Sequence, residues 1–332
     1  MKRVLVTGGG GFIGLALTRA LLAKGIEVVV LGRHHYPAVR RAGATGIIGD
    51  IRDLQTVKKA VSGCDTVFHV AARAGIWGPF NDYYSINVLG TLNVLAACKA
   101  GSVPNLVYTS TPSVVFDGKS LKGVDESVPY ARTPLCHYVT TKILAEKAVL
   151  RASDDSFQTA ALRPHLVWGP GDTNLIPRLM TRGRSGDLRI VGNGENLVDI
   201  AYIDNVVHAH LLAAENLETS GTAAGKAFFI GQIAPVNLWK WINDVFTRLG
   251  VPPVQKTVSL RKARFAGRMM EMFHSLTCNS KEPKMTRFLA EQLALSHYFS
   301  IKRAVEILHY SEQVSTTKGL DRMVAWLKQS NF

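Results

Sequence analysis

The chain has 332 residues, of which 47% are hydrophobic and 19% charged, and this balance excludes an intrinsically disordered protein. Its length suits a doubly wound domain with a smaller second lobe. The formal net charge of +14 indicates an anionic ligand, substrate or surface. Much of this charge is local, because residues 256–287 hold eight Lys or Arg against two Glu.

Four cysteines, Cys64, Cys98, Cys136 and Cys278, lie far apart and match no metal-ligand spacing. We therefore expect free thiols in a reducing compartment and no metal site. No signal-peptide pattern follows Met1, and no run reaches the roughly 18 apolar residues of a membrane span, which predicts a cytoplasmic protein. Nucleic acid is not an expected partner, because no basic stripe with interleaved aromatic residues occurs.

Strand and helix patterns alternate along the first half of the chain. Short apolar runs predict strands at 4–6, 28–31, 46–50, 66–70 and 106–110, and helical apolar spacing predicts a helix at 12–24. Alternation on this spacing predicts an α/β fold, a doubly wound parallel sheet of the Rossmann type. The strands are apolar without interruption, which fits a sheet covered on both faces.

After Pro164 the alternation loosens, and a helix at 205–216 and a strand at 227–230 follow. We expect residues 1–165 to form the Rossmann domain, to which segments near 200–230 return. Residues 166–332 are expected to form mainly a smaller, interleaved lobe that holds the substrate. No Pro- or Ser-rich linker divides the two parts.

A glycine-rich turn follows the first expected strand and opens the first helix. Gly8, Gly11 and Gly14 give a GxxGxxG spacing, with Phe12 and Ile13 at the start of the helix. Glycine permits a tight turn and lets backbone N–H groups approach a pyrophosphate, and the helix N-terminus adds its positive dipole end. Such turns also serve structural roles alone, but the position between strand and helix predicts a dinucleotide site.

The end of the second strand indicates which dinucleotide binds. An NAD site has Asp or Glu there to bind both ribose hydroxyls, whereas this chain has Gly32-Arg33-His34. Arg33 can stack on adenine and pair with a 2′-phosphate, which favours NADP(H). The alternative is a solvated arginine beside a degenerate NAD site. Asp50 and Ile51, at the exit of the third strand, are expected to meet the edge of the adenine ring.

Tyr138 and Lys142 stand four residues apart, so a helix would place them on one face. The reference pKa of tyrosine is about 10, too high for easy proton exchange near neutral pH. A neighbouring ammonium stabilises the phenolate, so we expect Lys142 to lower the pKa of Tyr138. The pair is a candidate proton donor with its tuning group, although a surface Tyr/Lys pair has the same spacing.

These motifs, together with Asn87, the run Tyr108-Thr109-Ser110-Thr111 and Arg163-Pro164, resemble the extended short-chain dehydrogenase/reductase family in its order along nearly the whole chain. The resemblance implies hydride transfer with Thr111, Tyr138 and Lys142 as catalytic residues, Ser110 being the alternative to Thr111. It also implies further cofactor contacts at Ala71, Ala72, Asn87, Pro164, Leu166 and Val167.

Within that family, the chain is most similar to the 3β-hydroxysteroid dehydrogenase/isomerase branch and to its bacterial relatives that reduce 2-alkyl-3-oxoalkanoates in long-chain olefin biosynthesis. The segments that carry the likeness are 71–78, 108–114, 168–172, 174–179, 199–206 and 297–300. The resemblance implies an NADPH-dependent 2-alkyl-3-oxoalkanoate reductase, with a 3β-hydroxysteroid dehydrogenase as the alternative. A non-catalytic NADP(H)-sensing protein stays a third hypothesis, although an intact catalytic set favours an enzyme.

The basic segment 256–287 contains an expected helix at 263–276. One interpretation is a helix packed on the lobe with a solvated face. The other is a flexible wall over a long acyl chain, whose cationic groups meet a substrate carboxylate or a peripheral membrane surface. Apolar residues expected to face the substrate are Trp77, Phe80, Trp168, Leu175, Ile176, Met269, Met270 and Phe273. We also expect a homodimer.

Overall fold

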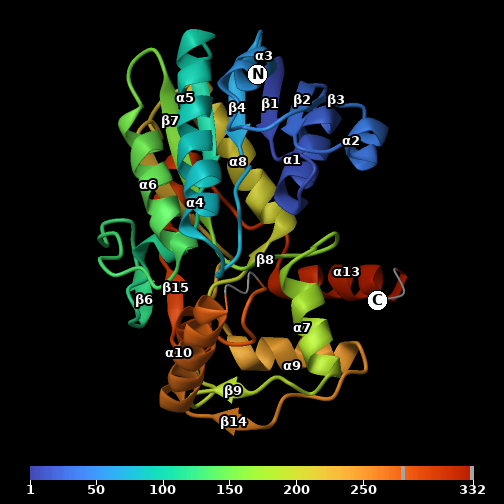
Figure 1. Cartoon of the computed structure of the whole chain (residues 1–332). Helices are drawn as coiled ribbons and strands as arrows, with labels where there is room; N and C mark the ends of the chain where they lie inside the picture. The colour runs from blue at the N-terminus through green and yellow to red at the C-terminus, as the bar shows by residue number, and fades with distance from the viewer. Residues whose placement is uncertain (278–280, 330–332) are drawn as a thin grey trace.

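The computed structural model describes residues 1–277 and 281–329 of the chain. Its centre is a seven-stranded, fully parallel sheet in the order β12-β7-β5-β4-β1-β2-β3 (Figure 1). The strands are β1 (Arg3–Thr7), β2 (Glu27–Gly32), β3 (Thr45–Ile48), β4 (Thr66–His69), β5 (Asn105–Thr109), β7 (Gln158–Pro164) and β12 (Lys226–Ile230). The order reverses between β1 and β4, and ligands of such sheets bind outside the carboxyl ends of the strands at this switch point.

Helices cover both faces of the sheet, because consecutive side chains of each strand point to opposite sides. In β1, Val4 and Val6 pack with α1 (Phe12–Ala23) and α8 (Ile203–Glu218), whereas Leu5 packs with the helices on the other face. Those helices are α3 (Leu54–Val61), α5 (Gly90–Ala100) and α6 (His137–Arg151). The doubly wound α/β fold expected from the sequence is confirmed.

All five strands predicted in the first half are present, and so are the helix at 12–24 and the later helix and strand. β7 is an addition that the sequence pattern did not indicate. It carries the Arg163-Pro164 motif at its end and pairs with β5 on one side and β12 on the other. The chain therefore returns to the sheet through α8 and β12, after it has begun the second lobe.

The second lobe lies below the carboxyl ends of the sheet strands in Figure 1. Its helices are α7 (Leu175–Arg184), α9 (Leu238–Arg248), α10 (Leu260–Leu276), α11 (Arg287–Ala294) and α13 (Thr316–Gln329). The short helix α12 (Lys302–Leu308) packs instead against β12 and α8 of the sheet domain. A small sheet in the order β13-β10-β15-β6 joins it to the first domain, with β6 at Leu121–Val124, β10 at Leu197–Val198, β13 at Val236–Asn237 and β15 at His297–Phe299. One hydrophobic cluster runs from α1 and α8 into this lobe through Trp168, Trp241 and Met323.

The shorter elements connect these parts. They are α2 (Pro37–Ala42), α4 (Phe80–Tyr83), a π-helical turn (Tyr84–Leu89), a 3₁₀ turn (Pro112–Val115), β8 (Val167–Trp168), β9 (Ile190–Val191), β11 (Ala201–Tyr202) and β14 (Thr257–Val258). Among the described residues, no helix is both long and apolar enough to cross a bilayer.

Candidate active site

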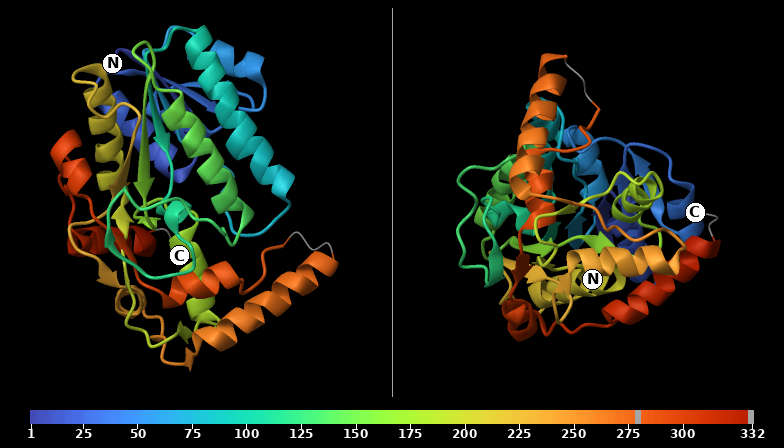
Figure 2. Two further views of the ribbon diagram at one scale, coloured as in Figure 1. Left: turned by 90° about the vertical axis from the view of Figure 1, so that its left-hand side faces the viewer. Right: turned by 90° about the horizontal axis from the view of Figure 1, so that it is seen from below.

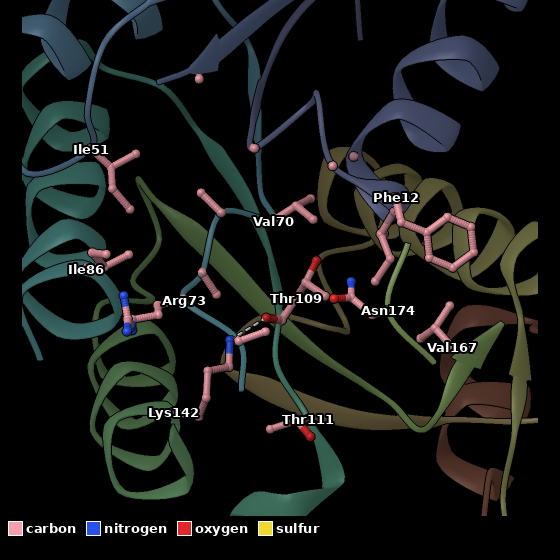
Figure 3. Close-up of a pocket in the computed structure, with 18 of the residues that line it drawn as sticks. Phe12, Ile51, Val70, Arg73, Ile86, Thr109, Thr111, Lys142, Val167 and Asn174 are labelled. Carbon is pink, nitrogen blue, oxygen red and sulfur yellow. Dashed lines mark hydrogen bonds between the residues drawn. The ribbon is translucent and has the colours of Figure 1, made fainter. Parts of the chain in front are cut away.

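A cavity of about 520 Å³ opens at the switch point, where the chain leaves β1, β4 and β5. Of the residues predicted to bind the cofactor or to act in catalysis, all but Asn87 line it. Figure 3 shows how they converge from separate elements, with Phe12 and Val167 on one side and Ile51 and Arg73 on the other. The tertiary structure thus brings together motifs that lie more than 100 residues apart in the sequence.

The glycine-rich turn forms one wall of this cavity and has no room for side chains. Gly8 has a φ of +70°, and a Cβ added there would lie 2.9 Å from the Cα of Ala71. At Gly14, an added Cβ would lie 2.3 Å from the carbonyl oxygen of Gly8, closer than real Cβ contacts allow. No side chain caps the N-terminus of α1 at Gly11, so its first N–H groups remain directed at the cavity.

A chain of buried hydrogen bonds fixes the opposite wall. The Ala71 N–H donates to the Thr7 hydroxyl, which lies 2.8 Å from His69 Nδ1, and His69 Nε2 lies 2.9 Å from Thr91 Oγ1. The Thr91 hydroxyl donates to the carbonyl of Asn87, so His69 Nε2 must donate to Thr91 and His69 Nδ1 must accept from Thr7. Burial lowers the pKa of His69 to about 3, which keeps the ring neutral.

Asn87 is the predicted site residue that the structure does not place on the cavity wall. Its amide oxygen accepts from the Arg73 N–H, and its amide nitrogen donates to the Arg73 carbonyl and to the Thr141 hydroxyl. The side chain is buried, with all its polar atoms bonded to protein. Asn87 therefore holds the turn at residues 71–73 in place from behind, and a direct cofactor contact is not supported.

Arg33 and Asp50 lie at the adenine end of the cavity. Arg33 is exposed at the end of β2, and Asp50 is paired with Arg52 at 2.7 Å. The Arg52 guanidinium lowers the pKa of Asp50, and the charge of Arg33 acts in the same direction, so Asp50 is an anion at neutral pH. The cavity wall also includes Tyr36, whose ring fills the space beside Gly10 and Gly32. The sequence analysis did not select this residue.

Tyr138 stands half-buried in the cavity wall on the first turn of α6, one turn before Lys142. Burial raises the pKa of Tyr138 to about 12, and a side-chain hydrogen bond with Thr111 acts against this rise. The expected lowering by Lys142 is not found. A phenol with a raised pKa is protonated at neutral pH, which is the state a proton donor requires.

Lys142 is buried, and its ammonium is directed elsewhere than expected. Its Nζ donates to the carbonyl oxygen of Thr109 at 2.7 Å (Figure 3). The same Nζ lies 4.1 Å from the centre of the Tyr108 ring. Burial lowers the pKa of Lys142 to about 7, and the negative charge of Glu146 acts in the opposite direction. Glu146 is itself paired with the buried Arg163, at 3.1 Å from its Nε.

Two further features mark the cavity as a ligand site. The buried hydroxyl of Ser110 lines it and makes no hydrogen bond to any described residue. Leu166 has a φ of +40°, a strained conformation for a branched side chain, in the segment predicted to hold the cofactor. No group of three His, Cys, Asp or Glu within the described ranges could hold a metal ion. Cys278 lies outside those ranges.

A second cavity of about 460 Å³ lies beside the first, under α10. The two adjoin along the chain, because Ala74 and Tyr138 line the first and Ile76 and His137 the second. The wall of the second cavity is apolar at Ile76, Trp77, Pro79 and Leu135, and charged at Glu271 and Arg287.

Most of the apolar residues predicted to face the substrate do not line this cavity. Trp77 does, but Trp168 and Ile176 are fully buried in the hydrophobic core. Met269 and Phe273 are exposed, because the face of α10 that meets the body carries Gly267, Glu271 and His274 instead. The helix is present as predicted, but its Met269 and Phe273 point away from this cavity.

The comparison with protein families decides the class of this protein. The model of the 3-beta hydroxysteroid dehydrogenase/isomerase family matches residues 5–261. The chain belongs to this family. It is accordingly an oxidoreductase of the short-chain dehydrogenase/reductase type, as its order of motifs indicated.

Relatives span nearly the whole chain. It is 45% identical to the 2-alkyl-3-oxoalkanoate reductase of Stenotrophomonas maltophilia, over 97% of this chain and 98% of that one. Its identity to the 2-alkyl-3-oxoalkanoate reductase of Shewanella oneidensis is 44%, over 98% of this chain and 87% of that one. The human sterol-4-alpha-carboxylate 3-dehydrogenase, decarboxylating, is 34% identical over 97% of this chain and 87% of its own length.

Among solved structures, MoeE5 in complex with UDP-glucose and NAD superposes with a TM-score of 0.77 at 26% identity, over 99% of this chain and 100% of that one. The structure of gox2253 gives a TM-score of 0.79 at 25% identity, over 99% of both chains. The likeness to these structures therefore extends through both the sheet domain and the second lobe.

Proposed function

We propose that this protein reduces the 3-oxo group of 2-alkyl-3-oxoalkanoates with NADPH. The observation that carries the proposal is the pairing of the Tyr138 cavity with an apolar second cavity whose wall contains Arg287. The two relatives with 44% and 45% identity are named for this reaction. Synthesis of long-chain olefins is the process that the resemblance suggests.

The first cavity fits a nicotinamide dinucleotide. Gly8 and Gly14 let the turn, α1 and the segment at Ala71 pack more closely than a Cβ would allow. This tight turn leaves the uncapped N-terminus of α1 at the cavity, where a pyrophosphate would bind. The residues that follow β2 favour NADP(H) over NAD(H), because Arg33 occupies the position where an NAD site has an acid that binds the ribose. MoeE5, with NAD bound, shows that this fold holds a dinucleotide.

When bound in the first cavity, a nicotinamide dinucleotide would supply a hydride for the carbonyl carbon. Tyr138 donates its phenolic proton to the oxygen, whose negative charge would otherwise grow as the carbon is reduced. The Thr111 hydroxyl, which already bonds with Tyr138, positions the same oxygen. Lys142, held by the Thr109 carbonyl, places its charge beside the cavity that would hold the nicotinamide ribose. Tyr138 regains its proton from solvent.

Arg287 is the candidate partner of the substrate carboxylate. Glu271 accepts from both the backbone N–H and the Nε of Arg287, which orients the guanidinium on the cavity wall. The two terminal nitrogens donate no hydrogen bond to any residue within 1–277 or 281–329. They could therefore bind a carboxylate in the bidentate manner typical of arginine. Of the eight basic residues in 256–287, Arg287 alone lines this cavity.

The test compares kcat/KM for a long-chain 2-alkyl-3-hydroxy acid with NADP⁺, for its methyl ester and for a 3β-hydroxysteroid. Working in the oxidation direction avoids the instability of free β-keto acids. We expect the acid to be preferred, and Arg287→Ala to raise the KM for the acid at least about tenfold, as a lost charge-assisted pair should, while leaving the ester unchanged. Arg264→Ala is the matched control, since Arg264 pairs with Glu291 away from the cavity.

A steroid or ester that exceeds the free acid would contradict the substrate assignment and favour a 3β-hydroxysteroid dehydrogenase. That alternative has support of its own, because the human sterol-4-alpha-carboxylate 3-dehydrogenase is 34% identical over 97% of this chain. A protein that binds NADPH but converts none of the three substrates would point to the sensing role instead.

A further inference from the structure

Five large apolar side chains are exposed along one face of α10. Phe265 is 67% exposed, Met269 44%, Met272 50%, Phe273 62% and Leu276 78%. At 3.6 residues per turn these positions fall within an arc of about 100°, the width of an apolar stripe that normally faces a core. Here the stripe faces outward, and Figure 2 shows α10 extending from the side of the body.

The opposite face of α10 is packed against the rest of the protein, so the helix cannot rotate about its axis. A Cβ at Gly267 would lie 2.6 Å from the backbone carbon of Thr286, so α10 and the start of α11 are in close contact. Ala263 is buried, and Glu271 is bonded to Arg287. The exposed stripe is thus a fixed property of the fold, because turning it inward would break these contacts.

Charge on the exposed side is uniformly positive. Arg261, Lys262 and Arg268 are exposed beside the stripe and form no ion pair among the described residues. The one acid of α10, Glu271, lies on the inner side. A stripe of Phe, Met and Leu bordered by Arg and Lys is the pattern of a helix that lies in a lipid interface, with its cations near anionic head groups.

We propose that the outer face of α10 docks the protein onto an anionic lipid surface. The inner face of the same helix lines the second cavity, through Glu271, His274 and Ser275. Docking would place the entrance to that cavity at the level where long alkyl chains are dissolved. Lipid binding itself requires neither the substrate nor the cofactor, so it can fail or hold independently of the proposed reaction.

The test measures sedimentation of the full chain with phosphatidylcholine vesicles, with and without phosphatidylglycerol, at low and high salt. We expect binding that depends on phosphatidylglycerol and weakens with salt. The double variant Phe265→Ser/Phe273→Ser should lower the partition coefficient at least about tenfold, since binding scales with buried apolar area. Ile233→Ser and Ile48→Ser are matched controls, being 77% and 62% exposed outside α10, and should bind as the wild type does.

Thermal unfolding of each variant checks that the chain still folds, and the exposed positions make an unchanged transition the expectation. Absence of binding to either vesicle would overturn the proposal. So would equal loss in the control variants. If the double variant instead dissociates an oligomer and leaves vesicle binding intact, the stripe is an interface with a second copy and the proposal is wrong.

Discussion

Tyr138 illustrates how burial and local partners set the state of a single residue. The spacing Tyr-x-x-x-Lys suggested a phenol tuned by an ammonium, but the ammonium of Lys142 bonds to the Thr109 carbonyl instead. Burial then dominates, and the pKa of Tyr138 rises to about 12. The phenol is therefore protonated at neutral pH, which is the state that proton donation requires.

Tyr138→Phe removes this donor and keeps the ring. We expect kcat to fall at least about 10²-fold, the low end for general acid catalysis, because the developing oxyanion loses its proton source. Dinucleotide affinity, measured by quenching of protein fluorescence, should stay within about threefold of the wild type if the loss is confined to proton transfer. Turnover close to that of the wild type would exclude Tyr138 as the donor.

Arg33→Ala tests the choice of cofactor. A charge-assisted pair with the 2′-phosphate contributes about 1.5–3 kcal/mol, so the Kd for NADPH should rise about 10- to 150-fold. The Kd for NADH should change much less, because NADH has no 2′-phosphate for Arg33 to pair with. Arg52→Ala is a useful comparison, since Arg52 pairs with Asp50 at the same end of the cavity. Equal losses for both dinucleotides, or a wild-type preference for NADH, would contradict an NADP(H) site.

At the scale of elements, the positions of β1, α1 and the turn after β4 depend on contacts that only glycine allows. Gly14 lets α1 begin directly over the Gly8 carbonyl, and Gly8 lets the turn at Ala71 approach. The Asn87 side chain holds the other end of that turn through both backbone groups of Arg73. Two walls of one cavity are therefore fixed by packing between segments that are distant in the sequence.

Gly14→Ala should disturb this arrangement, because its Cβ would lie 2.3 Å from the Gly8 oxygen. We expect dinucleotide binding to weaken at least about tenfold, or 1.4 kcal/mol, with a lower unfolding midpoint. Gly46→Ala is the matched control: an added Cβ meets nothing within 4 Å there. Isothermal titration and thermal unfolding of both variants measure the two effects. Equal behaviour of the two variants would show that the turn tolerates a side chain.

At the scale of the whole molecule, buried neutral histidines connect the protein's stability to pH. His210 accepts from the Thr109 hydroxyl at 2.7 Å and donates to the Val206 carbonyl at 2.7 Å, and burial lowers its pKa to about 4. His69, buried in its own network, has a pKa of about 3. Both rings connect a strand of the sheet to a helix. In each ring one nitrogen accepts a hydrogen bond from a threonine hydroxyl, and burial disfavours the charged form.

Folded-state pKa values below the unfolded value of about 6.5 mean that the unfolded chain takes up these protons first. Stability from these two groups is therefore complete above pH 6.5 and is lost as the pH falls toward 4 and then 3. Each should reduce the free energy of unfolding by about 1.5 kcal/mol between pH 6.5 and 5.0. Urea unfolding at these pH values measures it. In His210→Gln, which does not titrate, the decline should be smaller by about that amount; an unchanged slope would exclude His210 as a contributor.

The homodimer expected from the sequence stays a prediction. Leu92 on α5 and Leu144 on α6 are exposed and lie on the face opposite α1, where a second copy could cover them. That surface is separate from α10, so an oligomer formed there would leave the proposed lipid-binding face free. Sedimentation equilibrium of the double variant Leu92→Glu/Leu144→Glu measures whether an oligomer forms through this surface.

The sequence alone determined the fold class and predicted the glycine-rich turn and the one-turn spacing of Tyr138 and Lys142, because these depend on local spacing. The chemistry of the family was implied by the resemblance of the motifs in their order along the chain. Strand runs, glycines before a helix and residues four apart have one geometry wherever they occur. Only the tertiary structure decided where side chains point when their partners lie far away. In the folded chain Asn87 lies behind the cavity wall, and Lys142 bonds to the carbonyl of Thr109. Met269 and Phe273 are exposed to solvent. Helical periodicity defines an apolar face, but which neighbour covers that face, or whether any does, depends on packing between distant segments.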